Sequence, residues 1–241
     1  MSITYEMLKD GLYVCRSETH GFGTDAFLLT GFSRYRSGDR VCDLGTGCGI
    51  IPMLMQRTHP PKIIYAIDIQ PDAIEQLRLG IKKSSPAPQI EPICADLRLL
   101  WDDAPVGQLD LVTCNPPYNA ENTGFLSTDP QKRAARHEVS CTLEDVCFSA
   151  AKLLNYHGRF CVCCRPERLA DFICAMRKAG LEPKRLRFVS KSPESIPWLF
   201  LLEGMKGAKP FLQLERTLIV RSGDGLTTEA AELCLFGEHS I

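Results

Sequence analysis

The sequence predicts an α/β fold in which one mostly parallel β-sheet carries helices on both faces and an antiparallel element at its C-terminal edge. Short apolar segments of strand length alternate with segments typical of helices, and this order favours parallel βαβ units. The last three apolar segments follow one another closely, so we expect them to pair as antiparallel strands. The chain has 241 residues, 44% of them apolar, which fits a single domain over residues 1–241, with a lead-in at 1–38 and a core at 39–241.

Local signals support the expected helices. Pro71 suits a first helical turn, and Thr142 with Asp145 forms a capping pattern. The polar connection 119–141 is long, and such loops are usually functional or disordered. We expect strands at 40–44, 62–68, 90–95, 109–114, 159–164, 184–190, 198–203 and 212–220, and helices at 50–58, 71–83, 142–154 and 166–178.

Composition argues against a membrane or secreted protein. No apolar run approaches the roughly 18 residues that span a membrane, and residues 1–10 lack the basic start and apolar stretch of a secretory signal. We therefore expect a cytoplasmic protein without a membrane partner. The 12 cysteines stand mostly inside apolar segments, as small buried hydrophobic residues do. Cys161 and Cys164 form a C-x-x-C pattern, but residues three apart on a strand point to opposite faces, so we expect no metal site.

Charge is nearly balanced, with a net charge of −1, so composition as a whole does not indicate a nucleic-acid-binding protein. The stretch 177–191 nevertheless gathers lysines and arginines against one acidic residue, Glu182. A basic face of this kind suits a phosphate backbone, and an ordinary solvated face would have the same composition. On the first interpretation, Lys184, Arg185 and Arg187 are candidate RNA-binding residues.

A glycine-rich turn, Asp43-Leu44-Gly45-Thr46-Gly47-Cys48-Gly49, follows the first expected strand. Glycines allow close approach of the backbone to a ligand, and ligands of such sheets bind beyond the carboxyl ends of the strands. A dinucleotide site requires G-x-G-x-x-G, but Ile50 stands where that pattern needs its third glycine. Asp43 favours S-adenosylmethionine (SAM), because a carboxylate can pair with its cationic amino-acid end and would repel a pyrophosphate. We therefore expect Asp43, Gly45, Gly47 and Gly49 to bind SAM.

Two further acidic residues end the next two expected strands. Asp68 ends the second strand, where a carboxylate can accept both ribose hydroxyl protons, as in nucleotide-binding folds. Asp96 ends the third strand and can accept from the exocyclic amine of the cofactor adenine, and the next residue, Leu97, is a further candidate cofactor-binding residue. Each acid alone would be better explained as a helix cap or a loop residue. Three acids at the ends of three successive strands favour a cofactor site.

The fourth expected strand ends in Asn115-Pro116-Pro117-Tyr118. The prolines remove two N–H donors, which leaves carbonyl oxygens and the Asn115 side-chain oxygen as acceptors for an amino group. A planar amino nitrogen is a poor nucleophile because its lone pair is delocalised. Hydrogen bonds from its N–H groups can turn that lone pair toward the methyl group of SAM, and Tyr118 can stack on a flat substrate. These four residues are therefore candidate catalytic residues, although an isolated Asn-Pro turn would look the same.

With these motifs, the chain resembles the class I SAM-dependent methyltransferases that carry Asn-Pro-Pro-Tyr, and more narrowly the bacterial tRNA1(Val) adenine-N6-methyltransferase family. Further shared segments are 22–29, 136–138 and 198–206. The resemblance implies a Rossmann-like fold, SAM as the cofactor, and a lead-in that covers the SAM pocket with Thr24 and Asp25 at its border. It also implies methylation of the adenosine 3′ of the anticodon of tRNA(Val).

The leading hypothesis is therefore N6-methylation of an adenine in tRNA, whose loop bases can be splayed out for capture. Lys132, Arg133 and Arg136 of the long loop, together with the basic stretch, would contact phosphates. An alternative is another planar amine in the same site, such as protein glutamine or an rRNA guanine; the glutamine enzymes differ by a separate N-terminal helical domain. A third reading is a binding module with the SAM fold and no catalysis, against which the intact Asn-Pro-Pro-Tyr motif argues.

Overall fold

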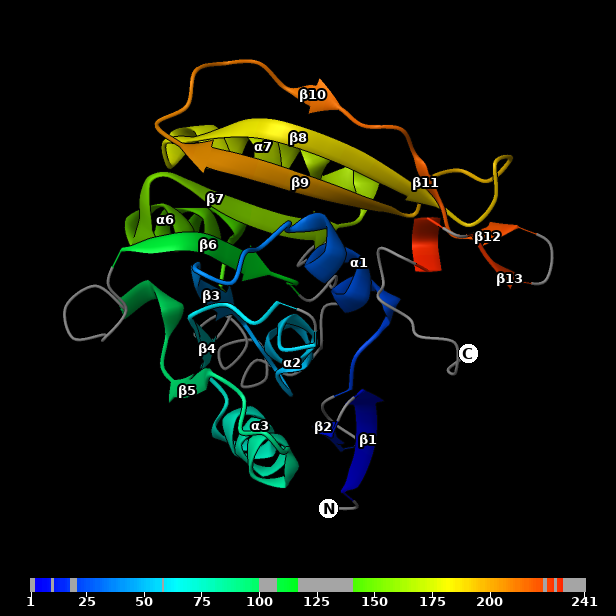
Figure 1. Cartoon of the computed structure of the whole chain (residues 1–241). Coiled ribbons are helices and arrows are strands. Elements are labelled where there is room, and N and C mark those ends of the chain that lie inside the picture. Colours follow the sequence, from blue (N-terminus) through cyan, green and yellow to red (C-terminus); the bar gives the residue numbers. More distant parts are fainter. Residues whose placement is uncertain are drawn as a thin grey trace, which may run out of the picture.

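The structure is a computed structural model that describes residues 3–9, 11–17, 21–57, 59–99, 108–116, 141–222, 225–227 and 229–231. One nine-stranded sheet runs through this part of the chain, and helices cover both of its faces (Figure 1). Among the helices within these ranges, none is both long enough and apolar enough to cross a membrane.

The sheet has the strand order β10-β8-β9-β7-β6-β3-β4-β5, with β11 also paired to β8. The central strands β3 to β7 pair in parallel, and β9 pairs antiparallel with both β7 and β8. The predicted Rossmann-like α/β fold is confirmed. The strands are β3 (Arg40–Leu44), β4 (Ile63–Asp68), β5 (Ile90–Cys94), β6 (Leu109–Cys114), β7 (Leu154–Cys164), β8 (Leu181–Ser190) and β9 (Leu199–Lys206).

The segment predicted as one strand at 212–220 differs from its prediction. It forms two short strands, β10 (Gln213–Leu214) and β11 (Leu218–Ile219), and both pair parallel with β8, where antiparallel pairing was expected. The cause is that β9 already occupies one edge of β8. The chain leaves β9 at the end where β8 begins, so it reaches the other edge of β8 running in the same direction as that strand.

Two hydrophobic clusters, one on each face of the sheet, follow from the alternation of side chains along the strands. Val41 of β3 belongs to the first cluster and its neighbour Cys42 to the second. Cys161 and Cys164 likewise fall into different clusters, so the opposite orientation predicted for this pair is confirmed. The first cluster includes residues of α1 (Thr24–Phe32), α2 (Ile50–Met55) and α3 (Pro71–Lys83), and the second includes residues of α6 (Leu143–Leu153) and α7 (Leu169–Lys178) (Figure 1).

An N-terminal hairpin that the sequence analysis did not assign packs against α3. Its strands β1 (Thr4–Lys9) and β2 (Leu12–Arg16) pair antiparallel. The Tyr13 N–H donates to Ser84 Oγ at 2.9 Å. Gly80 of α3 approaches the same strand, because a Cβ at this glycine would lie 2.8 Å from the Tyr13 carbonyl oxygen. The hairpin therefore depends on a close contact between the backbone of β2 and a glycine of the helix.

We expect Gly80→Ala to destabilise the protein, although alanine is intrinsically better than glycine in a helix by about 1 kcal/mol. The added methyl would meet backbone, which cannot rotate away, so the free energy of unfolding should fall by about 1–3 kcal/mol in urea denaturation. Gly38→Ala is the matched control, because its Cβ would meet nothing within 4 Å. Equal midpoints for the two variants would contradict the close contact.

Candidate active site

The carboxyl ends of β3 and β6 lie side by side in the middle of the sheet. In the parallel register, Asp43 pairs with Thr113 and Leu44 pairs with Cys114. From β3 the sheet continues through β4 and β5 on one side, and from β6 it continues through β7 on the other. Ligands of open α/β sheets bind in the crevice where the strand order reverses in this way. The glycine loop after β3 and Asn115 after β6 therefore lie beside each other at the carboxyl ends of these strands, where the strand order reverses.

The glycine loop turns back over the end of β4. The N–H groups of Gly45 and Thr46 both donate to the Ile67 carbonyl oxygen at 2.9 Å. Gly45 and Gly47 have positive φ angles of 69° and 54°, and a Cβ at either would meet nothing within 4 Å. Gly49 differs, because a Cβ there would lie 2.3 Å from Leu77 Cδ1 of α3. The first two glycines thus border open space, whereas the third allows the loop to pack on a helix.

Asp68 at the end of β4 holds the glycine loop in place. Its side chain is buried, with a residue exposure of 7%. Oδ2 accepts from the Gly47 N–H at 2.8 Å, and Oδ1 accepts from the Gln70 N–H at 2.9 Å. Each carboxylate oxygen has a further lone pair, so both oxygens retain the capacity to accept from a ligand such as a ribose diol.

Asp43 is a carboxylic acid inside the protein, with a residue exposure of 1%. Thr113 Oγ1 donates to its Oδ1 at 2.6 Å. Burial raises the pKa of Asp43 to about 7, the Thr113 hydrogen bond opposes that rise, and the charge of Asp68 adds to it. Thr113 was not among the predicted site residues. The sequence signal for Thr113 was its position two residues before Asn115, because residues two apart along an extended chain point to the same face.

Asp96 follows β5 and forms an ion pair with Arg98. Its two oxygens accept from the Arg98 N–H and from Arg98 Nε, at 2.9 to 3.0 Å, and they also bind Arg98 Nη2. The Arg98 hydrogen bonds lower the pKa of Asp96, so the carboxylate stays charged. Leu97 opens the short 3-10 helix η1 (Leu97–Leu99), and its carbonyl oxygen accepts from Ser149 Oγ at 3.0 Å. An adenine amine that donates to Asp96 would therefore share this carboxylate with Arg98.

Thr24 and Asp25 are the first two residues of α1, which begins after Gly23. Asp25 lies in the first turn, where the partial positive charge of the helix N-terminus favours a carboxylate. α1 contributes to the same hydrophobic cluster as α2, the helix that starts directly after the glycine loop. Their place at the border of a SAM pocket remains a prediction.

Asn115 directly follows β6, and its side chain is hydrogen-bonded to the neighbouring strand. Cys163 Sγ of β7 donates to Asn115 Oδ1 at 3.1 Å. Asn115 and Pro116 are half-buried. Pro117 and Tyr118 lie outside the described residues, so their catalytic roles remain predictions. Cys163 was not among the predicted site residues, because only strand pairing brings it to Asn115.

Three predicted RNA-binding residues, Lys132, Arg133 and Arg136, lie outside the part of the chain that the structure describes. Lys184 is half-buried on β8, and its Nζ donates to the Lys209 carbonyl oxygen at 3.1 Å. An amino group has two more protons to donate, so Lys184 remains a candidate for a phosphate contact.

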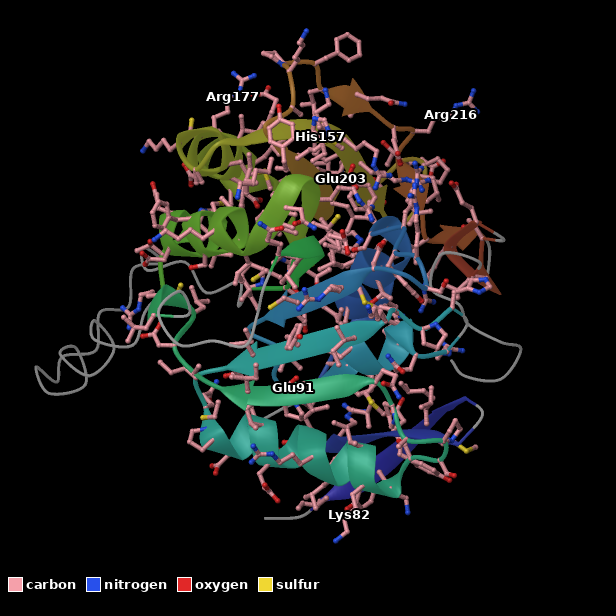
Figure 2. All side chains as sticks on the ribbon, turned by 60° about the vertical axis from the view of Figure 1, so that its left-hand side comes forward. Lys82, Glu91, His157, Arg177, Glu203 and Arg216 are labelled. Atoms are coloured by element: carbon pink, nitrogen blue, oxygen red, sulfur yellow. The ribbon has the colours of Figure 1, made fainter. Side chains whose placement is uncertain are left out.

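Arg185 and Arg187 do not form the basic surface that the sequence suggested. Arg185 is 9% exposed and donates to Glu203 and Glu215 at 2.9 to 3.0 Å. Arg187 is 7% exposed and pairs with Glu229. A buried charge must be paired, and these guanidinium groups are committed to carboxylates within the fold. Figure 2 shows Glu203 in the interior, while Arg177 and Arg216 reach the surface. We therefore leave Arg185 and Arg187 out of any RNA-binding surface.

The groups around the glycine loop fit SAM. The Asp43 carboxylate suits a cationic amino end, and the two Asp68 oxygens suit a pair of hydroxyl donors. The open space at Gly45 and Gly47 allows a ligand to approach the backbone closely. The buried Asp43 carboxylate beside the glycine loop would repel a pyrophosphate, so it disfavours a dinucleotide, whereas Asp68 suits the ribose of either ligand. No cluster of metal-ligating side chains occurs among the described residues.

Comparison with known proteins points to methyltransferases. A family model for the methyltransferase small domain matches residues 21–137. The chain is 32% identical over 182 residues to the tRNA1(Val) (adenine(37)-N6)-methyltransferase of Parabacteroides distasonis, covering 75% of each protein. It is 30% identical over 203 residues to the protein of the same name from Tolumonas auensis, covering 84% of this chain and 82% of that protein.

Solved structures share the fold at lower identity. A crystal structure described as a predicted O-methyltransferase from Agrobacterium tumefaciens has a TM-score of 0.72 at 19% identity, covering 88% of this chain and 95% of that one. A 16S rRNA N2 G1207 methyltransferase from T. thermophilus, in complex with AdoMet and guanosine, has a TM-score of 0.58 at 13% identity. The match covers 85% of this chain and 50% of that one. At these sequence identities the similarity shows a shared fold alone.

The buried Asp43 carboxyl should make the stability of the ligand-free protein depend on pH. Its folded-state pKa of about 7 lies above the ordinary value of 3.8, so stability is lost as the pH rises from about 4 to about 7 and then levels off. Asp43→Asn keeps an acceptor for Thr113 and carries no charge. We expect the variant to exceed the wild type in unfolding free energy at pH 8.5, and this difference to shrink by about 2 kcal/mol at pH 5.5. If urea titrations gave the same difference in unfolding free energy between variant and wild type at both pH values, that result would contradict the raised pKa.

Proposed function

The chain belongs to the tRNA1(Val) (adenine(37)-N6)-methyltransferase family, and we propose that it transfers a methyl group from SAM to the N6 amino group of an adenine in tRNA, the adenosine 3′ of the anticodon of tRNA1(Val). The observation that carries the proposal is the position of Asn115 after β6, beside the glycine loop at the end of β3. An acceptor for an amino group next to a cofactor loop is what methyl transfer to nitrogen requires.

The chemistry depends on how this chain holds the amino group. SAM, when bound, supplies a methyl group on a positively charged sulfur. Asn115 Oδ1 accepts one N–H of the adenine amine, and a backbone carbonyl oxygen of the Asn-Pro-Pro-Tyr segment accepts the other. These two hydrogen bonds turn the nitrogen lone pair out of the ring plane and toward the methyl group. The methylated nitrogen would be cationic and acidic, so it would release its proton to water. No strong base is therefore required, and positioning supplies much of the rate enhancement.

Asp43 holds the cationic amino end of the cofactor in this proposal. A cation beside a carboxylate lowers its pKa, which offsets the effect of burial on Asp43. Asp68 accepts from the ribose hydroxyls while it continues to hold Gly47. The lead-in at 1–38 covers the pocket, with Thr24 and Asp25 at its border.

The substrate assignment follows the relatives, which are named for adenine-N6 methylation of a tRNA. An anticodon-loop base is single-stranded and can be splayed into a pocket. Lys132, Arg133, Arg136 and Lys184 are the proposed phosphate contacts. Because tRNA is the substrate, we assign the protein to the cytoplasm.

Asn115→Ala should lower turnover by about 10²- to 10³-fold, by analogy with the loss of one preorganised hydrogen-bonding group. SAM binding measured by calorimetry should survive, because the glycine loop and its carboxylates are unchanged. Asn155→Ala is the matched control: Asn155 lies near the start of β7, at the other end of the strands from Asn115, and its Nδ2 donates to Asp110 Oδ1 at 3.1 Å. Full activity in the Asn115 variant would exclude its assigned role.

The substrate is tested with tritiated SAM and total tRNA, with and without ribonuclease. We expect labelled N6-methyladenosine after nucleoside digestion, and loss of macromolecular label after ribonuclease treatment. A strain without this protein should lack N6-methyladenosine at that position of tRNA1(Val). Label that survives ribonuclease on a protein would instead indicate a glutamine-type acceptor, and label on rRNA would indicate a ribosomal base.

A further inference from the structure

A buried thiol contacts the amide proposed to hold the substrate amine. Cys163 stands one residue before the end of β7 and has no exposed surface. Its Sγ lies 3.1 Å from Asn115 Oδ1. The contact follows from strand pairing, because Cys114 of β6 lies opposite Val162 of β7, and the next residue on each strand is Asn115 and Cys163.

The orientation of the Asn115 amide matters for the proposed reaction. A side-chain amide carries an acceptor oxygen and a donor NH₂ group of nearly the same shape, so rotation by 180° exchanges the two. With the NH₂ group toward the substrate, one donor would face another donor, and the amine would lose a hydrogen bond. A group that holds Oδ1 in position therefore separates a productive orientation from an unproductive one.

A thiol suits this task. It is a weak donor, so it can hold a carbonyl oxygen without strongly reducing the ability of that oxygen to accept a second hydrogen bond. A carbonyl oxygen has two lone pairs and can accept from Cys163 and from a substrate N–H at the same time. Burial keeps water away from the Cys163 thiol, so water does not compete for this contact.

We propose that Cys163 is a positioning residue for the methyl transfer, whose thiol holds the Asn115 side chain with Oδ1 toward the acceptor nitrogen. This inference rests on the proposed function, because it takes Asn115 to accept from the substrate amine. In this proposal the thiol acts on the reaction through its contact with Asn115.

Cys161 is the matched control on the same strand. It is also fully buried, it belongs to the same hydrophobic cluster, and it points to the same face of the sheet. Its Sγ lies 3.7 Å from Glu203 Oε2, so its side chain contacts the neighbouring strand β9. Replacement of either cysteine by alanine removes the same volume from the same core, and only one replacement removes the hydrogen bond to Asn115.

The kinetic test compares Cys163→Ala, Cys163→Ser and Cys161→Ala with tRNA as the acceptor. We expect Cys163→Ala to lower kcat by about fivefold to tenfold, the effect of one hydrogen bond, with the Kd for SAM within about twofold of the wild type. Cys163→Ser, which keeps a donor, should recover most of the rate. Equal losses in Cys163→Ala and Cys161→Ala, or no recovery in Cys163→Ser, would overturn the proposal.

Two further measurements separate positioning from a structural effect. In the background of Asn115→Ala, adding Cys163→Ala should cause no additional loss of kcat; a further fivefold loss would overturn the proposal. The second measurement needs no catalysis. The side-chain amide signals of Asn115 in a ¹⁵N-asparagine-labelled protein, assigned by their absence in Asn115→Ala, should shift in Cys163→Ala and stay in place in Cys161→Ala. Unshifted signals would overturn the inference even in an active enzyme, whereas shifted signals with no label on tRNA would refute only the proposed function.

Discussion

The structure depends on the pairing of β3 with β6 at the centre of the sheet. These strands come from different halves of the fold, yet Asp43 and Thr113 lie opposite one another in register and share a hydrogen bond of 2.6 Å. That pairing brings the glycine loop and Asn115 together at the carboxyl ends of the two strands. It also places them where the strand order reverses, since the sheet continues toward β4 on one side and toward β7 on the other. Cofactor site and acceptor site are consequences of one parallel pairing.

The proposed cofactor site places two buried carboxylates beside the glycine loop, and the burial of Asp43 has an energetic cost. Asp68 accepts from the Gly47 N–H and so fixes the backbone of the loop, and Asp43 remains buried although burial opposes its charge. Hydrophobic clusters on both faces of the sheet stabilise the fold around these carboxylates. In the proposed site, a ligand with a cationic end would relieve the unfavourable burial of Asp43, so the group that destabilises the ligand-free protein would favour cofactor binding.

The other half of the sheet is held by a buried ionic network. Glu203 of β9 pairs with Arg185 of β8, its partner in the antiparallel register, and with Arg159 of β7. Arg185 also reaches Glu215 beyond β10. This network links β7, β8, β9 and Glu215 after β10, and it accounts for Arg185 of the basic stretch without assigning that residue to RNA. One of its members, Arg159, lies on β7, the strand that also carries Cys163.

The sequence alone determined the order of the main strands and helices from residue 40 to residue 206, the glycine loop, the acids at strand ends and the Asn-Pro-Pro-Tyr segment, because apolar periodicity, glycine and proline restrict the chain locally. Only the tertiary structure decided what depends on contacts between distant segments. These include the parallel pairing of β10 and β11 with β8, the packing of the N-terminal hairpin on Gly80, the burial of Arg185, the ion pair between Asp96 and Arg98, and the thiol of Cys163 beside Asn115. Strand pairing joins residues that are tens of positions apart, and one sequence pattern is compatible with several registers. The folded sheet selects one of them, and that selection places a cysteine where it holds the amide.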